Sequence, residues 1–496
     1  MLEEEIVRRE KAAKLREAGI DPYPPSTARD ATCAEAVSRF DAWGAEGKSI
    51  TLAGRLRSIR AHGGAAFADL TDESGKLQLH LKSDVIGEDS FALFASMIDL
   101  GDFIEATGTL FITKRGEKTL EVQAWRLLAK ALLPLPEKWH GLSDVEVRYR
   151  KRHLDLVANE EVRNLFRTRS LIVRTIRDFM HAEGFMEVET PILQTQAGGA
   201  SARPFVTHHN ALDIDLQLRI APELHLKRLI VGGFEKVFEI ARCFRNEGIS
   251  FQHNPEFTQI EFYWAYATYE DLMDLTERMV SGVVAATHGG KMTVERDGVA
   301  LDFTAPYPRK KFYDLVHEGT GIDLAKVRTE EDLKDAIAEK GLKLDLEAAV
   351  GYGETVDLLY KTYVRPKIVQ PTFVVDYPAE MIPLAKRKPD QPDRIATVQL
   401  LVQGIEVTKA YNELNDPLEQ EVRFMEEAKK KEAGSGEAQP ADADFVEALK
   451  YGMPPTAGFG MGIDRLTALL TGAHSIKEVI LFPTLRPEQE THEDGA

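Results

Sequence analysis

The hydrophobic and polar positions of the chain follow two different periods. Across residues 50–128, five short runs alternate apolar with polar residues, and glycine-containing turns separate the runs. This alternation is typical of β-strands, and five strands in so short a segment suit a small barrel. After residue 144, stretches with helical periodicity are mixed with short runs rich in Phe, Ile and Tyr. The mixture predicts an α+β catalytic domain rather than a doubly wound sheet.

Composition and periodicity divide the chain into consecutive parts. They are a helical extension over 1–48, an OB-fold barrel over 49–133, a linker over 134–150 and a catalytic domain over 151–496. The prolines Pro134 and Pro136 mark the linker. A helical insertion at about 305–370 carries no evident chemistry, and the polar, Gly- and Ala-rich residues 429–444 predict a loop.

The net charge of −18 excludes a generally basic nucleic-acid-binding surface. It leaves room for a local one, and residues 144–185 are helical and strongly basic, although a solvated charged face is the alternative. Only Cys33 and Cys243 occur as cysteines, which excludes a disulfide framework and suits a reducing, cytoplasmic location. No run of about 18 apolar residues occurs, so no membrane partner is expected.

The densest chemical signal lies at residues 237–266, which predict two strands joined by a loop. Alternation places four side chains of the second strand on one face: Phe257, Gln259, Glu261 and Tyr263. Arg245 belongs to the matching face of the first strand, where its guanidinium could clamp a phosphate or a carboxylate. Phe257 could stack on a purine. An exposed hairpin with surface ion pairs is the less favoured alternative.

A second signal is a glycine-rich strand followed by a helix at residues 454–472. Alternate glycines from Gly458 to Gly462 would let another group lie close to the strand backbone. Arg465 falls at the start of the helix, with Asp464 as a candidate helix cap. A guanidinium at a strand–helix junction favours phosphate contact, whereas the glycines alone would also fit tight packing.

A third signal is a predicted hairpin at residues 397–416 with Gln403-Gly404 as its turn. It predicts two cross-strand pairs, Leu401 with Glu406 and Gln399 with Thr408. Gln399 and Glu406 would then share a face and could hold Mg²⁺ against ATP phosphates. Glu413 follows Glu406 by an odd number of residues, so both can face one site only if a bulge or strand end intervenes. Surface carboxylates are the alternative.

In the predicted barrel, Phe67 and Gln78 could face the same open surface. An aromatic ring beside an amide is what stacking on a base and reading its edge require. The alternative, for a barrel that stood alone, is that Phe67 belongs to the core.

Three segments together resemble the signature motifs of class II aminoacyl-tRNA synthetases. GFMEVETPIL, with Pro191, resembles motif 1, FRNE with HNPEFTQIE resembles motif 2, and GFGMGIDR resembles motif 3. The resemblance is closest to the lysyl-tRNA synthetase family and covers nearly the whole chain. It includes RIAPELHLKRLIVGGFEKVFEI and YNELND.

The resemblance implies a six-stranded antiparallel catalytic sheet, an OB-fold anticodon domain and a homodimer built around motif 1. It also implies a reaction in two steps. The lysine carboxylate attacks the α-phosphate of ATP, which gives lysyl-adenylate and pyrophosphate, and the terminal ribose of tRNA(Lys) then accepts the lysyl group. Neither step needs a protein nucleophile, so catalysis rests on positioning and on electrostatic stabilisation.

The resemblance also assigns residues to roles. The expected ATP contacts are Arg245, Glu247, His253, Asn254, Phe257, Glu406 and Arg465. Of these, Arg245 and Arg465 are the catalytic residues, and Glu406 is a ligand of Mg²⁺. The expected lysine pocket consists of Gly199, Glu223, Glu261, Tyr263, Tyr411 and Glu413. The residues expected to read the anticodon are Phe67, Gln78 and Glu117.

Three residues depart from the family pattern. Gln399 stands where a second magnesium-binding carboxylate is usual, so affinity for that ion should fall. Lys409 replaces a usual asparagine near the amino acid, where it could pair with the lysine carboxylate or repel the substrate. Ile382 replaces a usual serine. The last two leave room for an altered amino-acid preference.

Two alternatives to a lysine enzyme stay open. One is a related synthetase for aspartate or asparagine, against which the acidic pocket argues, because aspartate would need a cation. The other is a synthetase-like paralogue that binds RNA or modifies a protein lysine. Truncated paralogues usually lack the N-terminal barrel, which this chain has.

Overall fold

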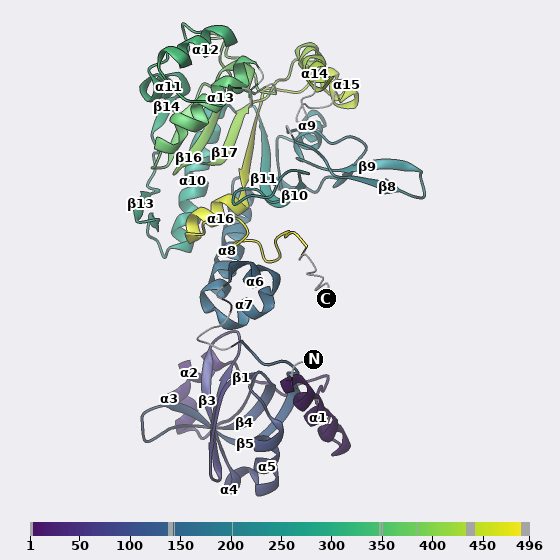
Figure 1. Ribbon diagram of the computed structural model, residues 1–496, viewed down its shortest axis with the longest axis vertical. Coiled ribbons are helices and arrows are strands. Elements are labelled where there is room, and N and C mark those ends of the chain that lie inside the picture. The colour runs from purple at the N-terminus through teal and green to yellow at the C-terminus, as the bar shows by residue number, and fades with distance from the viewer. Residues whose placement is uncertain are drawn as a thin grey trace, which may run out of the picture. The chain divides into compact units, whose positions relative to one another are not determined.

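The computed structural model describes residues 3–136, 142, 144–200, 202–346, 349, 351–382, 384–432 and 442–487. The chain divides into two compact units, Met1–Ser143 and Asp144–Ala496, both drawn in Figure 1. The division falls inside the segment that the sequence predicts as the linker. The last linker residues belong to the second unit, where they form helix α6 (Val145–Arg150).

The first unit is built on a closed five-stranded barrel with the strand order β1-β2-β3-β5-β4. Its strands are β1 (Ser49–His62), β2 (Ala65–Thr71), β3 (Lys76–Lys82), β4 (Phe103–Ile112) and β5 (Lys118–Ala129). Alternate residues of β2 and β3 are buried, because successive side chains of a strand point to opposite faces. The predicted barrel is confirmed.

The helices of the first unit pack on this barrel. They are α1 (Glu3–Glu17), α2 (Cys33–Ser38), α3 (Phe40–Ala45), α4 (Ser83–Ile86) and α5 (Glu88–Met97). Leu15 of α1, Phe40 of α3 and Phe94 of α5 join the barrel core. A capping box starts α2, since Thr32 and Glu35 each accept a hydrogen bond from the other's backbone N–H. The predicted extension and the barrel therefore share one core.

The second unit contains an eight-stranded sheet with the order β14-β15-β16-β17-β18-β11-β10-β6. Its strands are β6 (Met186–Glu187), β10 (Lys236–Phe244), β11 (Glu256–Ala265), β14 (Arg309–Lys311), β15 (Thr372–Val375), β16 (Thr397–Val402), β17 (Ile405–Asn412) and β18 (Thr456–Gly462). The strands from β15 to β10 pair in antiparallel fashion. The expected antiparallel catalytic sheet is present, and β14 and β6 add a parallel strand at each edge.

One face of this sheet is apolar and covered by helices. The helices are α8 (Glu160–Ala182), α10 (Tyr269–Thr287) and α16 (Ile463–Thr471), which share a core with the strands. Within that core, Phe262 of β11 stacks on Phe459 of β18 with 4.4 Å between the ring centroids. The polar residues of the same strands point to the opposite face because side chains alternate. That second face carries the candidate site.

The other elements of the second unit surround the sheet. They are helices α7 (Arg152–Ala158), α9 (Glu223–Val231), α11 (Phe312–Thr320), α12 (Glu330–Glu339), α13 (Tyr352–Tyr363), α14 (Pro417–Glu432) and α15 (Ala443–Lys450), and the small sheets β7 (Leu193–Gln194), β8 (Val206–His209), β9 (Ile214–Leu218) and β12 (Thr293–Arg296), β13 (Val299–Asp302). In Figure 1, α14 and α15 lie beside α9, with which α15 is in contact. Among the described helices, none is both long and apolar enough to cross a membrane.

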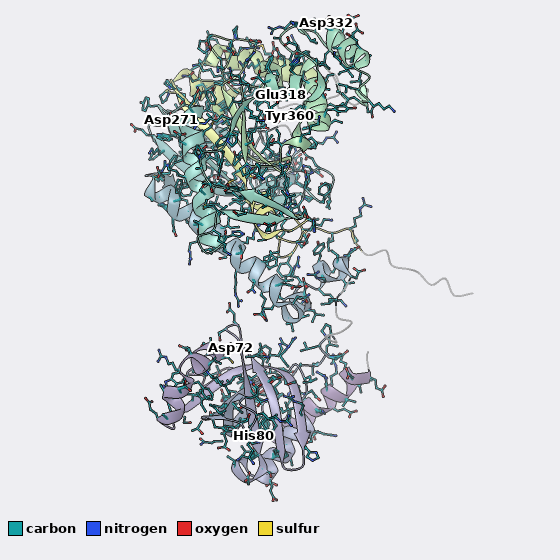
Figure 2. The ribbon with its side chains drawn as sticks, turned by 90° about the vertical axis from the view of Figure 1, so that its left-hand side faces the viewer. Asp72, His80, Asp271, Glu318, Asp332 and Tyr360 are labelled. Atoms are coloured by element: carbon teal, nitrogen blue, oxygen red, sulfur yellow. The ribbon has the colours of Figure 1, made fainter. Side chains whose placement is uncertain are left out.

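The predicted insertion contains helices α11, α12 and α13, and it also supplies β14 to the main sheet. Figure 2 labels Glu318 on α11 and Tyr360 on α13. Tyr360 packs on Phe312 with ring centroids 4.5 Å apart, so these helices have an aromatic core of their own. The insertion is therefore continuous with the catalytic sheet at its β14 edge.

The hairpin of β16 and β17 has the predicted Gln403-Gly404 turn. The φ angles of these residues are +48° and +68°, which the turn type that suits a twisted hairpin requires. Leu401 pairs with Glu406, as predicted from the sequence.

A bulge in β17 corrects the rest of the predicted register. Gln399 does not pair with Thr408 but with Lys409, because the register shifts by one residue after Glu406. The extra residue brings Glu406 and Glu413 to the same cavity despite their odd spacing. The sequence requires a bulge for these two carboxylates to share a site, and the structure contains it.

The polar segment predicted as a loop at 429–444 is helical at its start, because α14 continues to Glu432. Residues 433–441 lie outside the described residues. Helix α15 then begins at Ala443.

Candidate active site

A cavity of about 470 Å³ opens on the polar face of the catalytic sheet. Strands β17, β18 and β11 lie side by side along it. The loop from 245 to 255, which connects β10 to β11, lies at one end of the cavity. Every residue that the sequence resemblance assigns to ATP or to lysine lines this cavity. The candidate magnesium ligand Gln399 is not among the lining residues.

The glycines of β18 keep the middle of the cavity open. Gly458 lies between Tyr263 of β11 and Tyr411 of β17 in the strand register. A Cβ atom at Gly458 would lie 2.0 Å from Glu413 Oε1 and 2.6 Å from the Tyr263 ring. No side chain fits there without displacing a predicted lysine-pocket residue, so the glycine is needed for close approach.

Two guanidinium groups lie at one end, which we call the phosphate end. Arg245 follows the last residue of β10, and its Cζ atom is 5.0 Å from the centre of the Phe257 ring. Arg465 lies in the first turn of α16, with Nη1 4.0 Å from Glu406 Oε1. Burial lowers the pKa of Arg465, and the Glu406 carboxylate opposes this shift. These groups can bind phosphate oxygens, and the Phe257 face can take a purine.

The loop before β11 completes the phosphate end. The Asn254 amide nitrogen donates to the Glu256 carbonyl at 2.7 Å, whereas its Oδ1 is buried and has no hydrogen-bond partner among the described residues. His253 Nδ1 lies 2.9 Å from Ser250 Oγ. Burial, followed by the charge of Arg465, lowers the pKa of His253, so the ring is neutral at pH 7. Glu247 is exposed at the cavity rim.

The opposite end of the cavity, the amino-acid end, is acidic and buried. Glu223, Glu261 and Glu413 are 4%, 7% and 1% exposed. The Tyr411 hydroxyl donates to Glu223 at 3.1 Å, and the Tyr263 hydroxyl donates to Glu261 at 3.4 Å. The Lys227 ammonium pairs with Glu223 and Glu413, but one cation does not balance three buried carboxylates, so this end favours a further cationic ligand.

The pKa shifts at this end have one main cause. Burial raises the pKa of Glu261 well above its usual value, and the Glu223 charge adds to the shift. Burial also raises the pKa values of Tyr263 and Tyr411, so both hydroxyls stay protonated donors at neutral pH. Gly199, with φ of +88°, lies against Glu223 because a Cβ there would be 2.8 Å from the Glu223 Cβ.

The three departures from the family pattern lie in different surroundings. Lys409 lines the cavity, and Gly460 separates it from Glu261 in the strand register. Gln399 is buried, and its Oε1 accepts the Tyr377 hydroxyl at 2.8 Å. Ile382 is a buried wall residue. Of these three residues, only Lys409 places a charge in the cavity.

The prediction that Asp464 caps helix α16 is wrong. The N-cap residue is Gly462, which makes no side-chain cap. Asp464 Oδ2 instead accepts the Thr258 backbone N–H at 2.8 Å, and its Oδ1 pairs with Arg169 at 2.6 Å. The carboxylate therefore ties α16 to β11 and α8 beside the cavity.

On the barrel, Phe67 and Gln78 share a face, as predicted. Phe67 is half-buried and stacks on His80 with ring centroids 4.3 Å apart, so it is not a core residue. Figure 2 labels His80 on this unit. The Gln78 amide oxygen accepts from Thr119 at 3.0 Å, and Glu117 is exposed two residues before that threonine. The three candidate anticodon residues thus come from one region of β2, β3 and the β4–β5 turn.

Two segments of the chain match known families. Residues 50–128 match an OB-fold nucleic acid binding domain, and residues 144–486 match the tRNA synthetases class II (D, K and N). The second match alone covers more than half of the chain.

The chain belongs to the class II tRNA synthetases. Curated relatives named lysine–tRNA ligase match it along almost its full length. The relative from Roseiflexus castenholzii is 50% identical, with 97% of this chain and 98% of the relative covered. Relatives from Moorella thermoacetica and Pelotomaculum thermopropionicum are 49% and 47% identical, over 98% and 97% of this chain and 98% and 95% of their own lengths.

Two residues that contact carboxylates of this class II synthetase cavity have no predicted role, Gln259 in its lining and Lys227 behind it. Gln259 is assigned to the correct strand face but without a role, and its amide nitrogen donates to Glu261 at 2.7 Å. Lys227 was not singled out, yet its ammonium pairs with Glu223 at 2.6 Å and with Glu413. The available signal was a lysine four residues after a glutamate, on a helix whose other buried residues are apolar.

The described residues contain no cluster of three or more His, Cys, Asp or Glu side chains that could hold a metal ion. Glu406 lies at the phosphate end opposite Arg465, and its side chain is 27% exposed. One carboxylate is a sufficient protein contribution for a magnesium ion that arrives on ATP, because such ions take most ligands from phosphates and water. The donor set of this synthetase cavity therefore fits ATP-bound Mg²⁺.

Proposed function

We propose that the chain is a lysine–tRNA ligase, which activates lysine with ATP and transfers it to the 3′ end of tRNA(Lys). One observation carries this proposal: a single cavity joins a buried end with three carboxylates to an end with two guanidinium groups. The first end suits the ammonium groups of lysine, and the second suits a triphosphate. The names of the relatives support the same reaction.

The first step joins lysine to AMP. An oxygen of the lysine carboxylate attacks the α-phosphorus of ATP, and the bond to pyrophosphate breaks. Arg245 holds the carboxylate and the α-phosphate together, which offsets the charge that grows on the transferred phosphorus. Phe257 lies under the adenine, and Arg465 holds its other face or the γ-phosphate. Glu247, His253 and Asn254 complete the ATP contacts.

Lysine lies over the glycines of β18 in this proposal. Glu223, Glu261 and Glu413 bind its two ammonium groups, while Tyr263 and Tyr411 pack on its aliphatic stem and orient the carboxylates. Gly199 forms the edge of the pocket. The proposal is supported by the burial of all three carboxylates and by the raised pKa of Glu261, which calls for a cationic partner.

We propose Mg²⁺ as the cofactor, with Glu406 as its protein ligand. The ion would neutralise charge on the ATP phosphates. Gln399 remains a proposed second ligand, although its amide oxygen accepts the Tyr377 hydroxyl and it does not line the cavity. Its contribution to the binding of the ion is therefore expected to be small.

The second step moves the lysyl group from the adenylate to the terminal ribose of tRNA(Lys), and AMP leaves. The barrel face with Phe67, Gln78 and Glu117 is the proposed anticodon reader. Phe67→Ala should raise the KM for tRNA about 10-fold, since stacking on one base contributes about 1–3 kcal/mol. ATP–pyrophosphate exchange should be unchanged, because it needs no tRNA.

The free, buried cysteines support a cytoplasmic location.

We further propose that the protein is a homodimer, as the resemblance in motif 1 implies. Exposed apolar side chains support it. Several occur in the segment of the chain from β6 to β9: Met186, Ile192, Leu193, Val206, Leu212 and Ile214. Exposed apolar side chains gathered in one segment fit a contact between subunits. Light scattering coupled to gel filtration should give twice the chain mass, and a monomer mass would refute the proposal.

The test of the proposed reaction is amino-acid-dependent ATP–pyrophosphate exchange with lysine, ornithine, aspartate and asparagine. Strong exchange with lysine alone supports it. Exchange with aspartate or asparagine instead would show that Lys409 and Ile382 have altered the specificity. Exchange with lysine but no charging of tRNA(Lys) would favour a protein-modifying or RNA-binding paralogue.

A further inference from the structure

The lysine pocket contains a lysine of its own. Lys227 lies on α9, one turn after Glu223, and its side chain is 1% exposed. Its Nζ atom is 2.6 Å from Glu223 Oε1 and also pairs with Glu413 Oε2. Both carboxylates line the cavity, whereas Lys227 does not. The ammonium therefore reaches the two carboxylates from behind the cavity wall.

The environment of Lys227 makes a charge there costly. The ammonium lies 5.9 Å from the ring centroids of Tyr263 and Tyr411 and 5.8 Å from that of Phe445. Its neighbours on α9, Leu226 and Ile230, belong to the apolar core that these rings share. An apolar residue would fit this core, and replacing a buried ion pair by apolar side chains often stabilises a protein. Fold stability alone does not explain the lysine.

The charges of the pocket and the substrate explain it better. Glu223, Glu261 and Glu413 would bring three negative charges, and the two ammonium groups of lysine bring two positive ones. The substrate carboxylate belongs to Arg245 at the other end of the cavity. Lys227 supplies the third positive charge, so the occupied pocket is neutral.

The ion pair with Lys227 also leaves one carboxylate oxygen of Glu413 available to the substrate. Lys227 forms its ion pair with Glu413 Oε2, whereas no ion pair reaches Oε1, and neither oxygen has another hydrogen-bond partner among the described residues. Glu413 Oε1 lies beside the Gly458 backbone on the cavity floor, because a Cβ atom at Gly458 would be only 2.0 Å from it. It is thus directed toward the space that a substrate ammonium would occupy.

We propose that Lys227 is a positioning residue for lysine, which pairs with Glu223 and Glu413 and keeps them oriented for the substrate ammonium groups. The inference rests on the proposed lysine pocket and adds to it the group that makes the pocket match a diamino acid. Two carboxylates this close in a buried site share a proton unless a cation lies between them. Without Lys227, a shared proton would neutralise one of the two carboxylates, and the pocket would lose one of its sites for an ammonium group.

The test measures ATP–pyrophosphate exchange by Lys227→Met, which keeps the length and packing of the side chain. We expect the KM for lysine to rise roughly 100-fold, because one partner of a buried ion pair is removed. The KM for ATP should change less than about twofold, since ATP contacts the other end. Lys227→Arg should recover part of the affinity for lysine.

The pH dependence separates positioning from a merely structural role. The titratable groups that face Lys227 in the described part of the chain are Glu223, Glu261, Glu413, Tyr263 and Tyr411. Burial raises the pKa of Glu413 to about 8 although the charge of Lys227 opposes the shift, so the methionine variant should carry a still more protonated carboxyl. Its KM for lysine should then fall steeply from pH 7 to pH 8.5, whereas that of the unaltered enzyme should fall less.

Lys236→Met is the matched control. Lys236 lies on β10 of the same unit, donates to the Glu183 carbonyl at 2.9 Å and lies over the Trp264 ring, outside the cavity lining. Its variant should keep the KM for lysine. If Lys227→Met does not fold, Lys227→Arg carries the test: its KM for lysine should rise because the guanidinium orients the carboxylates differently, while its pH dependence should match that of the unaltered enzyme because the charge is kept.

The outcomes also distinguish this inference from the proposed pocket. If Glu223→Gln and Glu413→Gln raise the KM for lysine but Lys227→Met leaves it unchanged, or raises it equally at every pH, the role of Lys227 is refuted alone. If none of the glutamate variants affects the KM for lysine, the pocket itself is wrong, and the inference is wrong with it.

Discussion

At the amino-acid end of the cavity the carboxylates Glu223 and Glu413 are almost fully buried, whereas the side chains of Arg465 and Glu406 at the phosphate end are 31% and 27% exposed. Water cannot stabilise the buried charges, so the fold itself supplies their cation, Lys227. At the phosphate end the charges stay partly solvated, and Arg465 lies 4.0 Å from Glu406 without a close ion pair.

This difference indicates how the two ends work. The carboxylates at the amino-acid end are positioned by folding, so the geometry that selects the ligand exists before a ligand binds. The charges at the phosphate end stay partly exposed and are paired less closely, so a bound ligand would complete their surroundings. Substitutions at the two ends should therefore affect different kinetic constants.

The largest effect is expected for Arg245→Ala. The guanidinium would stabilise charge that develops on the α-phosphate, and such a contribution is typically worth 10²–10³ in rate. We expect kcat for lysine-dependent exchange to fall roughly 1000-fold, and the thermal shift caused by lysine to shrink without vanishing, because Arg245 would also hold the substrate carboxylate while the ammonium sites remain. Arg242→Ala is the control, because Arg242 pairs with Glu256 and does not line the cavity. A fall of less than about tenfold would contradict the role of Arg245.

The next effect tests the other end. Glu413→Gln removes a buried carboxylate that pairs with Lys227, so the KM for lysine should rise about 100-fold. The KM for ATP should stay within about twofold. Steady-state exchange at varied lysine and varied ATP measures both constants. Equal increases in the two constants would mean that the ends of the cavity are not separate.

The pH dependence of thermal stability tests the acidic character of the amino-acid end. Burial raises the pKa of Glu261 in the empty protein, so this carboxyl holds a proton more tightly when folded than when unfolded. The empty protein should lose stability as the pH rises above the unfolded pKa of about 4.3. Lysine binding supplies a cation and favours the ionised form, so the increase in Tm caused by lysine should grow from pH 6 to pH 8. A shift that shrinks over this range would contradict the acidic pocket.

The sequence was informative where local patterns determine geometry. Alternation along β11 placed Gln259, Glu261 and Tyr263 on one face, and the odd spacing of Glu406 and Glu413 required the bulge that the structure contains. The six antiparallel strands of the sheet follow from the family resemblance rather than from periodicity.

The sequence was less informative where packing between distant segments decides. Nothing near Lys227 in the chain shows that α9 packs against the end of β17, which brings its ammonium to Glu413. The bulge was predicted but not its position, so the partner of Gln399 was wrong. Asp464 has the spacing of a cap, yet its contacts to Thr258 and Arg169 come from tertiary packing.

The smallest effect is expected at Lys409, which lies between the two ends. Its ammonium has no ion-pair partner in the described part of the chain, and Gly460 leaves the space toward Glu261 open. We predict that it pairs with the substrate carboxylate beside Arg245. Lys409→Asn should then raise the KM for lysine about fivefold, as expected for a partly solvated ion pair.

Lysinamide provides the matched control for this prediction, because it keeps both ammonium groups and lacks the carboxylate. Its inhibition constant should be the same for the unaltered enzyme and for Lys409→Asn. An unchanged or lower KM for lysine in the variant would show that Lys409 repels the substrate or ignores it. An inhibition constant for lysinamide that rises as much as the KM for lysine would instead assign Lys409 to the amino-acid end, and the separation of the two ends would then extend one strand position further along β17.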